Sequence, residues 1–185
     1  NKIKRRARFM KLKFTIPFVA LLLSVPTVQA QTNMSAKETA TKIAERIVNS
    51  TTYLFENKKT GETYSTVKNI PLSKDVEVQS KYTQWHYTNG VTNIALMELG
   101  DKLSDKKYEN YVLKNMNFVF NEGNLDYFKK LYDNAFAEGG WGAVRNVSWH
   151  MIFRGKRLDD NGPMSASLIE LQQHHPNDAF LKYIN

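Results

Sequence analysis

Apolar residues recur at helical spacing along most of this chain, so the pattern predicts a mainly helical protein. The first predicted helix starts at a capping box, Ser-Ala-Lys-Glu at 35–38, and ends near Asn49. Periodicity fades over residues 51–84, which indicates a long loop with room for short strands. Further helices are expected beyond Gly90, from about Tyr108 to Gly123, from about Leu125 to Gly139, and after Asn161.

The predicted helices differ in how much of their surface is apolar. Beyond Gly90 apolar residues cover nearly the whole circumference, so we expect this helix to be buried on most sides. The helix from Tyr108 has one apolar stripe and should have a wet face opposite it. Residues 141–156 carry aromatic side chains without periodicity and are interpreted as an irregular loop. The wet face should carry Lys107, Glu109, Lys114 and Asn115.

The chain contains an internal repeat at an offset of 72 residues, the separation of Gly90 and Gly162. This offset aligns Asn-Gly with Asn-Gly at the mouths of two helices. We therefore expect two related helical hairpins, each with an inner helix opening at Asn-Gly and an outer helix carrying aromatic residues. Stacked hairpins of this kind build solenoids or closed toroids. The aligned pairs are Leu96 with Leu168, Met97 with Ile169, Glu98 with Glu170, Leu99 with Leu171, Tyr108 with Phe180, Tyr111 with Tyr183, and Val112 with Ile184.

Two adjacent carboxylates, Asp159 and Asp160, precede the second Asn-Gly. In a structural interpretation, one of them caps the helix and the other is solvated. In a chemical interpretation, the pair lies on a concave rim and acts on a sugar or on water. A helix N-terminus stabilises a charged carboxylate, so the pair would then orient hydroxyl groups rather than donate a proton. The sequence alone leaves both interpretations open.

Other residues with chemical potential give weaker signals. The histidines show no metal-ligand spacing, so no metal is expected. The tryptophans Trp85, Trp141 and Trp149 are suited either to stacking on sugar rings or to packing. The chain has no nucleophile–histidine signature and no phosphate-binding glycine loop. The histidines are His86, His150, His174 and His175.

The formal net charge of +8 raises the question of a nucleic-acid partner, and the location of that charge answers it. Residues 1–30 hold seven lysines and arginines and no acidic residue, so residues 31–185 carry only +1. We therefore expect no nucleic-acid partner. With 185 residues and 42% hydrophobic content, the chain is long enough for one domain with a sizeable core.

The basic N-terminal segment is typical of an export signal. From Met10, two lysines precede an apolar run that ends at a small-residue site, so cleavage after Ala30 is expected. Residues 1–30 are thus interpreted as upstream residues plus a cleavable signal peptide, and residues 31–185 as the domain. The apolar run is short and interrupted by prolines, so no stable membrane anchor is expected. With no cysteine to accept a lipid, a periplasmic or secreted protein is the simplest interpretation.

Two motif blocks stand in a characteristic order. The first is Trp-His-Tyr-Thr-Asn-Gly at 85–90, followed by an apolar helix and then by Tyr108 and Tyr111. The second is Leu-Asp-Asp-Asn-Gly-Pro-Met at 158–164, followed by a helix rich in small residues. Over about residues 35–185, the chain resembles the N-terminal portion of unsaturated glucuronyl and rhamnogalacturonyl hydrolases, glycoside hydrolase families 88 and 105. The resemblance implies an all-α fold, an (α/α)6 toroid of which the N-terminal half is present.

The resemblance also implies a reaction. Such enzymes act on oligosaccharides whose non-reducing uronic acid carries a C4–C5 double bond, which they protonate and hydrate so that the resulting hemiketal collapses. They need no metal or organic cofactor. By motif matching, Asp159 is the better counterpart of a family active-site aspartate, with Asp160 as the alternative. Trp85, Tyr87 and Asn89 match the block that lines the sugar pocket.

In one respect the chain departs from that family. The family's principal proton donor is an aspartate in a Trp-x-Asp block downstream of Leu-Asp-Asp, and nothing after Asp160 matches it. The chain is therefore expected to be an N-terminal fragment that is inactive alone. Two alternatives stay open: another toroidal carbohydrate enzyme, either a glycosidase or a lyase, and a non-enzymatic helical-repeat module that binds glycans. The sequence does not indicate an oligomeric state.

Overall fold

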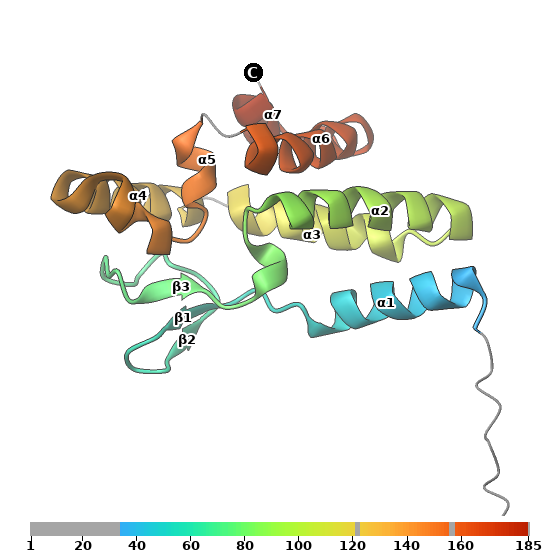
Figure 1. Cartoon of the computed structure of the whole chain (residues 1–185), viewed down its shortest axis with the longest axis horizontal. Coiled ribbons are helices and arrows are strands. Elements are labelled where there is room, and N and C mark those ends of the chain that lie inside the picture. The colour runs from blue at the N-terminus through green and yellow to red at the C-terminus, as the bar shows by residue number, and fades with distance from the viewer. Residues whose placement is uncertain (1–33, 121–122, 156–157, 185) are drawn as a thin grey trace, which may run out of the picture. The chain divides into compact units, whose positions relative to one another are not determined.

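The computed structural model describes residues 34–120, 123–155 and 158–184, which form one compact unit (Figure 1). The unit is predominantly helical, as expected from the periodicity. The predicted signal peptide lies outside the described residues. The α-helices are α1 (Ala36–Ser50), α2 (Tyr87–Leu103), α3 (Lys107–Phe120), α4 (Asn124–Ala143), α5 (His150–Arg154), α6 (Leu158–His174) and α7 (Asp178–Ile184).

Residues 51–84 contain a small antiparallel sheet, which agrees with the prediction of a loop with room for short strands. The strand order is β2-β1-β3, with Phe55 of the central strand paired to Tyr64 on one side and Val78 on the other. The strands are β1 (Phe55–Asn57), β2 (Thr63–Tyr64) and β3 (Val76–Val78), and the 3-10 turn η1 (Lys81–Thr83) follows them.

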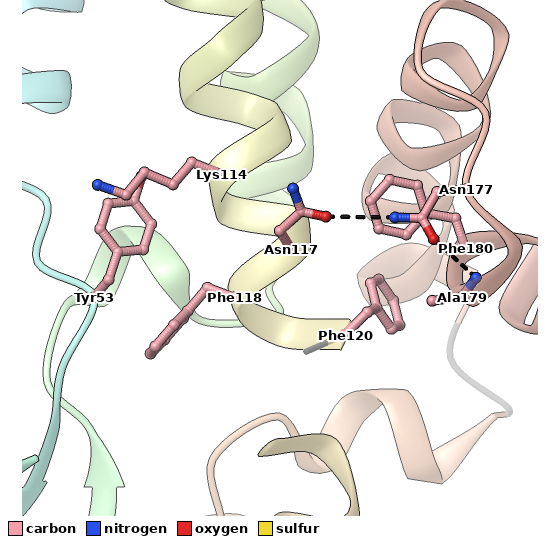
Figure 2. A pocket seen from close by; sticks show the side chains of 8 residues that line it. All are labelled: Tyr53, Lys114, Asn117, Phe118, Phe120, Asn177, Ala179 and Phe180. Carbon is pink, nitrogen blue, oxygen red and sulfur yellow. Dashed lines mark hydrogen bonds between the residues drawn. The ribbon is translucent and has the colours of Figure 1, made fainter. Parts of the chain in front are cut away.

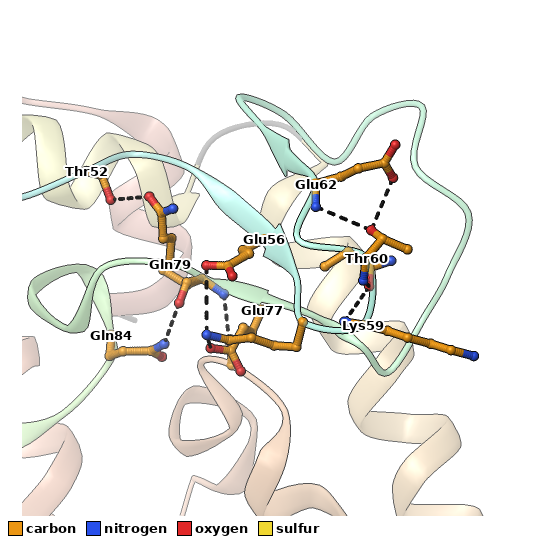
Figure 3. Close-up of polar contacts among 12 residues, drawn as sticks. Thr52, Glu56, Lys59, Thr60, Glu62, Glu77, Gln79 and Gln84 are labelled. Atoms are coloured by element: carbon orange, nitrogen blue, oxygen red, sulfur yellow. Dashed lines mark hydrogen bonds and ion pairs between the residues drawn. The ribbon is translucent and has the colours of Figure 1, made fainter.

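Polar side chains fasten this sheet to the chain on either side of it (Figure 3). Thr52 Oγ1 donates to Gln79 Oε1 at 2.8 Å, and Gln84 Nε2 donates to the Val78 carbonyl at 3.2 Å. These bonds join the segment before β1 to the segment after β3. The sheet therefore leads directly into η1 and the start of α2.

The helices form layers around the antiparallel pair α2 and α3. In Figure 1, α1 lies on one side of this pair and α6 on the other, and α7 packs on α6. Both α2 and α6 begin at the end of the bundle that faces the sheet, α4 and α5. The first residues of the two helices therefore lie at a shared rim.

α3 supplies the centre of the hydrophobic core. Its predicted apolar stripe is confirmed, since the exposed fractions of Tyr108, Val112 and Met116 are all 0%. A second cluster of aromatic rings joins the sheet to α3, α4 and the segment before α5, with ring centroids 4.9–6.1 Å apart. This cluster consists of Phe55, Phe118, Phe128 and Trp149.

Two predictions about burial were wrong. α2 is not buried on most sides, because the face that carries Val91 and Ala95 is open along α1 and no described element covers it. The wet face of α3 is narrower than predicted, because Glu109 and Asn115 are buried at 7% and 4% exposure. Burial of the Asn115 amide is tolerated because its Oδ1 accepts a hydrogen bond from Tyr53 Oη at 2.9 Å.

Two predictions about element boundaries were also wrong. Residues 141–156 are not an irregular loop: α4 runs through a bend at Gly140 to Ala143, the 3-10 turn η2 (Val144–Asn146) follows, and then α5. The bend uses positive φ at Gly140, a conformation that only glycine adopts readily. The inner helices also begin before their Asn-Gly pairs rather than at them.

Candidate functional site

The two motif blocks meet where α2 and α6 cross. A Cβ atom placed on Gly90 would lie 2.3 Å from the Pro163 carbonyl carbon and 2.4 Å from the Met164 nitrogen. The two backbones are therefore in direct contact, which only a glycine at position 90 permits. Since both helices begin within a turn or two of this contact, their first residues share one rim.

Trp85 joins the blocks by a hydrogen bond. Its indole Nε1 donates to Asn161 Oδ1 at 2.8 Å, and its ring packs edge-on against Phe120 with centroids 5.7 Å apart. The side chain is only 6% exposed. Trp85 is therefore a packing residue that helps to hold the starts of α2 and α6 together, and its indole N–H is already used in the bond to Asn161.

The predicted catalytic aspartates lie in the first turn of α6. Because the helix begins at Leu158, Asp159 and Asp160 are helical residues and neither is the N-cap, so the capping interpretation was wrong. Asp159 is exposed, and the side chain of Asp160 lies outside what the structure describes. Pro163 has no N–H, so the Asp159 carbonyl four residues earlier lacks its usual helical donor. The group that the described first turn presents at the rim is the exposed Asp159 carboxylate.

Tyr87 is the exposed aromatic residue of the first block. It begins α2, its side chain is 47% exposed, and its ring lies 4.7 Å from that of His86. His86 caps the helix, since its Nδ1 accepts from the Thr88 backbone N–H at 3.4 Å. Tyr87 is therefore held at the mouth of α2 with an accessible ring.

Asn89 has a different environment from the one the resemblance implied. Its Nδ2 donates to the carbonyls of Lys81 and Gln84, each at 2.8 Å, and the residue is 9% exposed. These bonds fasten η1 to the first turn of α2. The amide is therefore committed to the fold, and a contact between Asn89 and substrate stays a prediction.

At the opposite end of the inner helices, a buried carboxylate holds α3 to the end of α6. Glu109 Oε1 lies 3.1 Å from His174 Nδ1 and 3.0 Å from His175 Nε2, and Lys106 Nζ donates to Glu109 Oε2 at 2.6 Å. The hydrogen bond from Lys106 is the largest cause that lowers the pKa of Glu109 to about 2, and those from His174 and His175 add to it against the cost of burial.

Metal chemistry receives no support from this cluster. Among the described residues, no group of three or more histidines, aspartates or glutamates is arranged to hold a metal ion. The contacts of Glu109 are those of a structural anchor between two helices.

No helix in the described part of the chain has both the length and the apolar character needed to cross a membrane.

The structure therefore brings together Trp85 and the segment that carries Asp159, and it leaves Tyr87 exposed at the same rim. Sequence reasoning missed Asn161 as the partner of Trp85, although the aligned Asn-Gly pairs marked that position. Comparisons with protein-family models, curated proteins and solved structures find no match to this chain. Any assignment of function consequently depends on the rim itself and on the motif blocks.

Proposed function

We propose that the rim formed by α2 and α6 binds the unsaturated uronyl end of an oligosaccharide, and that the protein serves hydrolysis of that end. The observation that carries the proposal is the contact between two motif blocks that lie far apart in sequence. Trp85 donates to Asn161, and Gly90 packs on Pro163. These contacts support a shared site, since each block alone carries only part of the chemistry.

In this proposal water adds across the C4–C5 double bond. A proton is added to C4 and the water oxygen is added to C5. The resulting hemiketal collapses by breaking the bond between C5 and the ring oxygen, and the hemiacetal left at C1 then releases the attached sugar as an alcohol. The exposed carboxylate of Asp159 is an acceptor, which suits it to orienting sugar hydroxyl groups or the water. Tyr87 offers a ring face for the sugar. The proton is assigned to a Trp-x-Asp aspartate, which these 185 residues lack, so turnover is assigned to a protein that also contains that block.

The fold proposed for such a protein is the (α/α)6 toroid. Support comes from the face of α6 that carries Gly162, the counterpart of Gly90. A Cβ atom on Gly162 would meet nothing within 4 Å, whereas one on Gly90 would collide with the next inner helix. Ile169, the counterpart of the buried Met97, is 44% exposed. The second inner helix thus has an open face where the first has a neighbour, as a continuing ring of hairpins requires.

The test has a binding arm and a turnover arm. Unsaturated disaccharides made by a polysaccharide lyase should bind the chain, and Tyr87→Ala and Asp159→Asn should weaken binding without unfolding it. Asp101→Asn is the matched control, because Asp101 is an exposed aspartate near the other end of α2. In a protein that includes the Trp-x-Asp block, the ultraviolet absorbance of the unsaturated end should disappear with time.

Each arm can reject part of the proposal. Absorbance that stays constant across a panel of unsaturated disaccharides rejects the hydrolase. Binding that is unchanged in Asp159→Asn and in Asp160→Asn rejects the site assignment and favours the helical-repeat binding module.

A further inference from the structure

A cavity lies away from the rim, where α3 meets the segment before β1 and the start of α7 (Figure 2). Its volume is about 520 Å³, and neither Tyr87 nor Asp159 lines it. We propose that this cavity, here called the α3–α7 cavity, binds a carboxylate-bearing sugar residue. Its lining residues are Tyr53, Lys114, Asn117, Phe118, Phe120, Asn177, Ala179 and Phe180.

The charge in the α3–α7 cavity is a lysine without a counter-ion. Lys114 Nζ lies 4.2 Å from the centroid of the Tyr53 ring, and no carboxylate of the described residues lies within 4.0 Å of it. Several other lysines of the described part pair with carboxylates, as Lys106 does with Glu109. Lys114 therefore makes no ion pair with the described residues, and the N–H groups that do not face the Tyr53 ring are open to a ligand.

The amide groups of the cavity leave a further donor. Asn177 makes two side-chain hydrogen bonds here: its Oδ1 accepts from the Ala179 N–H at 2.9 Å, and its Nδ2 donates to Asn117 Oδ1 at 3.5 Å. Figure 2 shows the oxygen of Asn117 directed at Asn177. The amino group of Asn117 makes no hydrogen bond to the described residues. The polar groups open to a ligand thus include the Lys114 ammonium and the amino group of Asn117, and an anion is the ligand group that suits these donors best.

The remaining walls are aromatic and fixed. The rings of Phe118, Phe120 and Phe180 are 8%, 9% and 0% exposed, so packing holds them in place. Tyr53 Oη already donates to Asn115, and burial raises the pKa of Tyr53, which keeps the ring neutral. These packed rings give the cavity an apolar wall of fixed shape, against which the C–H groups of a pyranose can pack.

An apolar wall combined with unpaired donors selects a ring that carries a carboxylate. That this ring is a sugar rests on the function proposed above, whereas the requirement for an anion comes from Lys114 and Asn117. The cavity would then hold a uronate of the same oligosaccharide class that the rim binds, at a second position on the molecule.

The test is a nuclear magnetic resonance titration of the whole chain. The probes are α-1,4-linked digalacturonate and its neutral counterpart, α-1,4-linked digalactose, with the side-chain amide signals of Asn117 and Asn177 as the readout. Digalacturonate should shift both signals and bind at least about tenfold more tightly than digalactose. Added salt should weaken binding, since the contact is between charges.

Two lysine variants separate the cavity from general surface charge. Lys114→Ala should raise the dissociation constant for digalacturonate at these signals about tenfold, and Lys114→Arg should retain most of the affinity. Lys81→Ala is the matched control, because Lys81 lies 5.2 Å over the ring of Tyr82 but lines no part of this cavity. Equal binding of the neutral disaccharide, or equal losses in Lys114→Ala and Lys81→Ala, would overturn the proposal.

A rim variant distinguishes this inference from the proposed function. Asp159→Asn should leave the shifts of Asn117 and Asn177 unchanged. If unsaturated disaccharides bind the rim while digalacturonate does not shift the signals of Asn117 and Asn177, the cavity proposal fails and the proposed function stands. Shifts that depend on Lys114 in a chain that shows no rim binding support the cavity and count against the rim.

Discussion

The two hairpin units of this chain have equivalent sequences but different surroundings. α2 and α6 both contain 17 residues, and Leu96 and its counterpart Leu168 are buried at 4% and 1% exposure. In the outer helices, Tyr108 and Phe180 are both 0% exposed. These positions are buried in both units, although their neighbours differ: Tyr108 Oη donates to Glu45 of α1, whereas Phe180 packs on Phe120 of α3.

Positions that face the next unit behave differently. Met97 is 4% exposed whereas its counterpart Ile169 is 44% exposed. The same contrast holds for an added Cβ atom, which would collide with α6 at Gly90 but at Gly162 would meet no described atom within 4 Å beyond its own helix and chain neighbours. The comparison teaches that an apolar pattern predicts which faces can be buried, while the presence of a neighbour decides which faces are.

The largest expected effect is at Gly90, the glycine that packs against the α6 backbone. Gly90→Ala would place a methyl group within 2.4 Å of the α6 backbone, so α2 and α6 must separate. We expect the free energy of unfolding to fall by about 3 kcal/mol. Urea unfolding followed by circular dichroism measures this change. A loss under about 1 kcal/mol would mean that the two backbones are not in contact, and it would remove the basis for a shared rim.

The aligned asparagines give the next contrast. Asn89→Ala removes two hydrogen bonds and leaves the carbonyls of Lys81 and Gln84 without this donor, so a loss of about 2 kcal/mol is expected. Asn161→Ala removes one bond, from Trp85, and should cost about 1 kcal/mol. The same unfolding measurement ranks the two variants. An Asn161→Ala loss larger than that of Asn89→Ala would contradict the structural role given to Asn89.

The lowered pKa of Glu109 predicts that the stability of the protein depends on pH. Only the first hairpin unit carries this carboxylate, since its counterpart in the repeat is Leu181. The pKa of Glu109 is lowered in the folded protein to about 2, from an ordinary value of 4.5. A carboxyl group with a lowered folded-state pKa contributes stability above its unfolded value and loses it as the pH falls toward the folded value. Stability should therefore decrease between about pH 4.5 and pH 2.

Glu109→Gln isolates this contribution. The variant should be about 1 to 2 kcal/mol less stable at neutral pH, a modest loss because Lys106 is largely exposed. Below pH 3 the difference from the unaltered protein should shrink. Acid unfolding monitored by tryptophan fluorescence tests both statements, and a difference that stays constant down to pH 2 would contradict the anchor.

Much of the fold could be predicted from the chain, and the misplacement of Glu109 and Asn115 shows what local spacing leaves out. The capping box at Ser35, the stripe of α3 and the repeat follow from local spacing, and the structure confirms the helices they predict. Glu109 and Asn115 were placed on a wet face because their partners lie on distant segments, at His174 and Tyr53. Spacing along one helix carries no information about such partners.

The candidate site was predictable to the same extent. The motif blocks indicated Tyr87 and Asp159, and the Asn-Gly repeat indicated that the two helix mouths are equivalent. The bond from Trp85 to Asn161 and the α3–α7 cavity depend on how α6 and α7 return to α2 and α3. No single segment of the sequence contains that geometry.

The smallest expected effect is at Gly162, the counterpart of Gly90, and it sharpens the comparison of the two hairpin units most. In the described structure, Gly162→Ala adds a methyl group that meets nothing within 4 Å beyond its own helix and chain neighbours. Alanine is favoured over glycine inside a helix, but the ring of Pro163 opposes a Cβ on the helical residue before it, so the variant should be more stable than the unaltered chain by at most about 0.5 kcal/mol. In a protein where a further inner helix packs on α6 as α6 packs on α2, the same substitution should be destabilising, as at Gly90. Measuring Gly162→Ala in this chain and in one extended by further hairpins thus tests the toroid directly, because equal stabilisation in both would show that the face of α6 stays open.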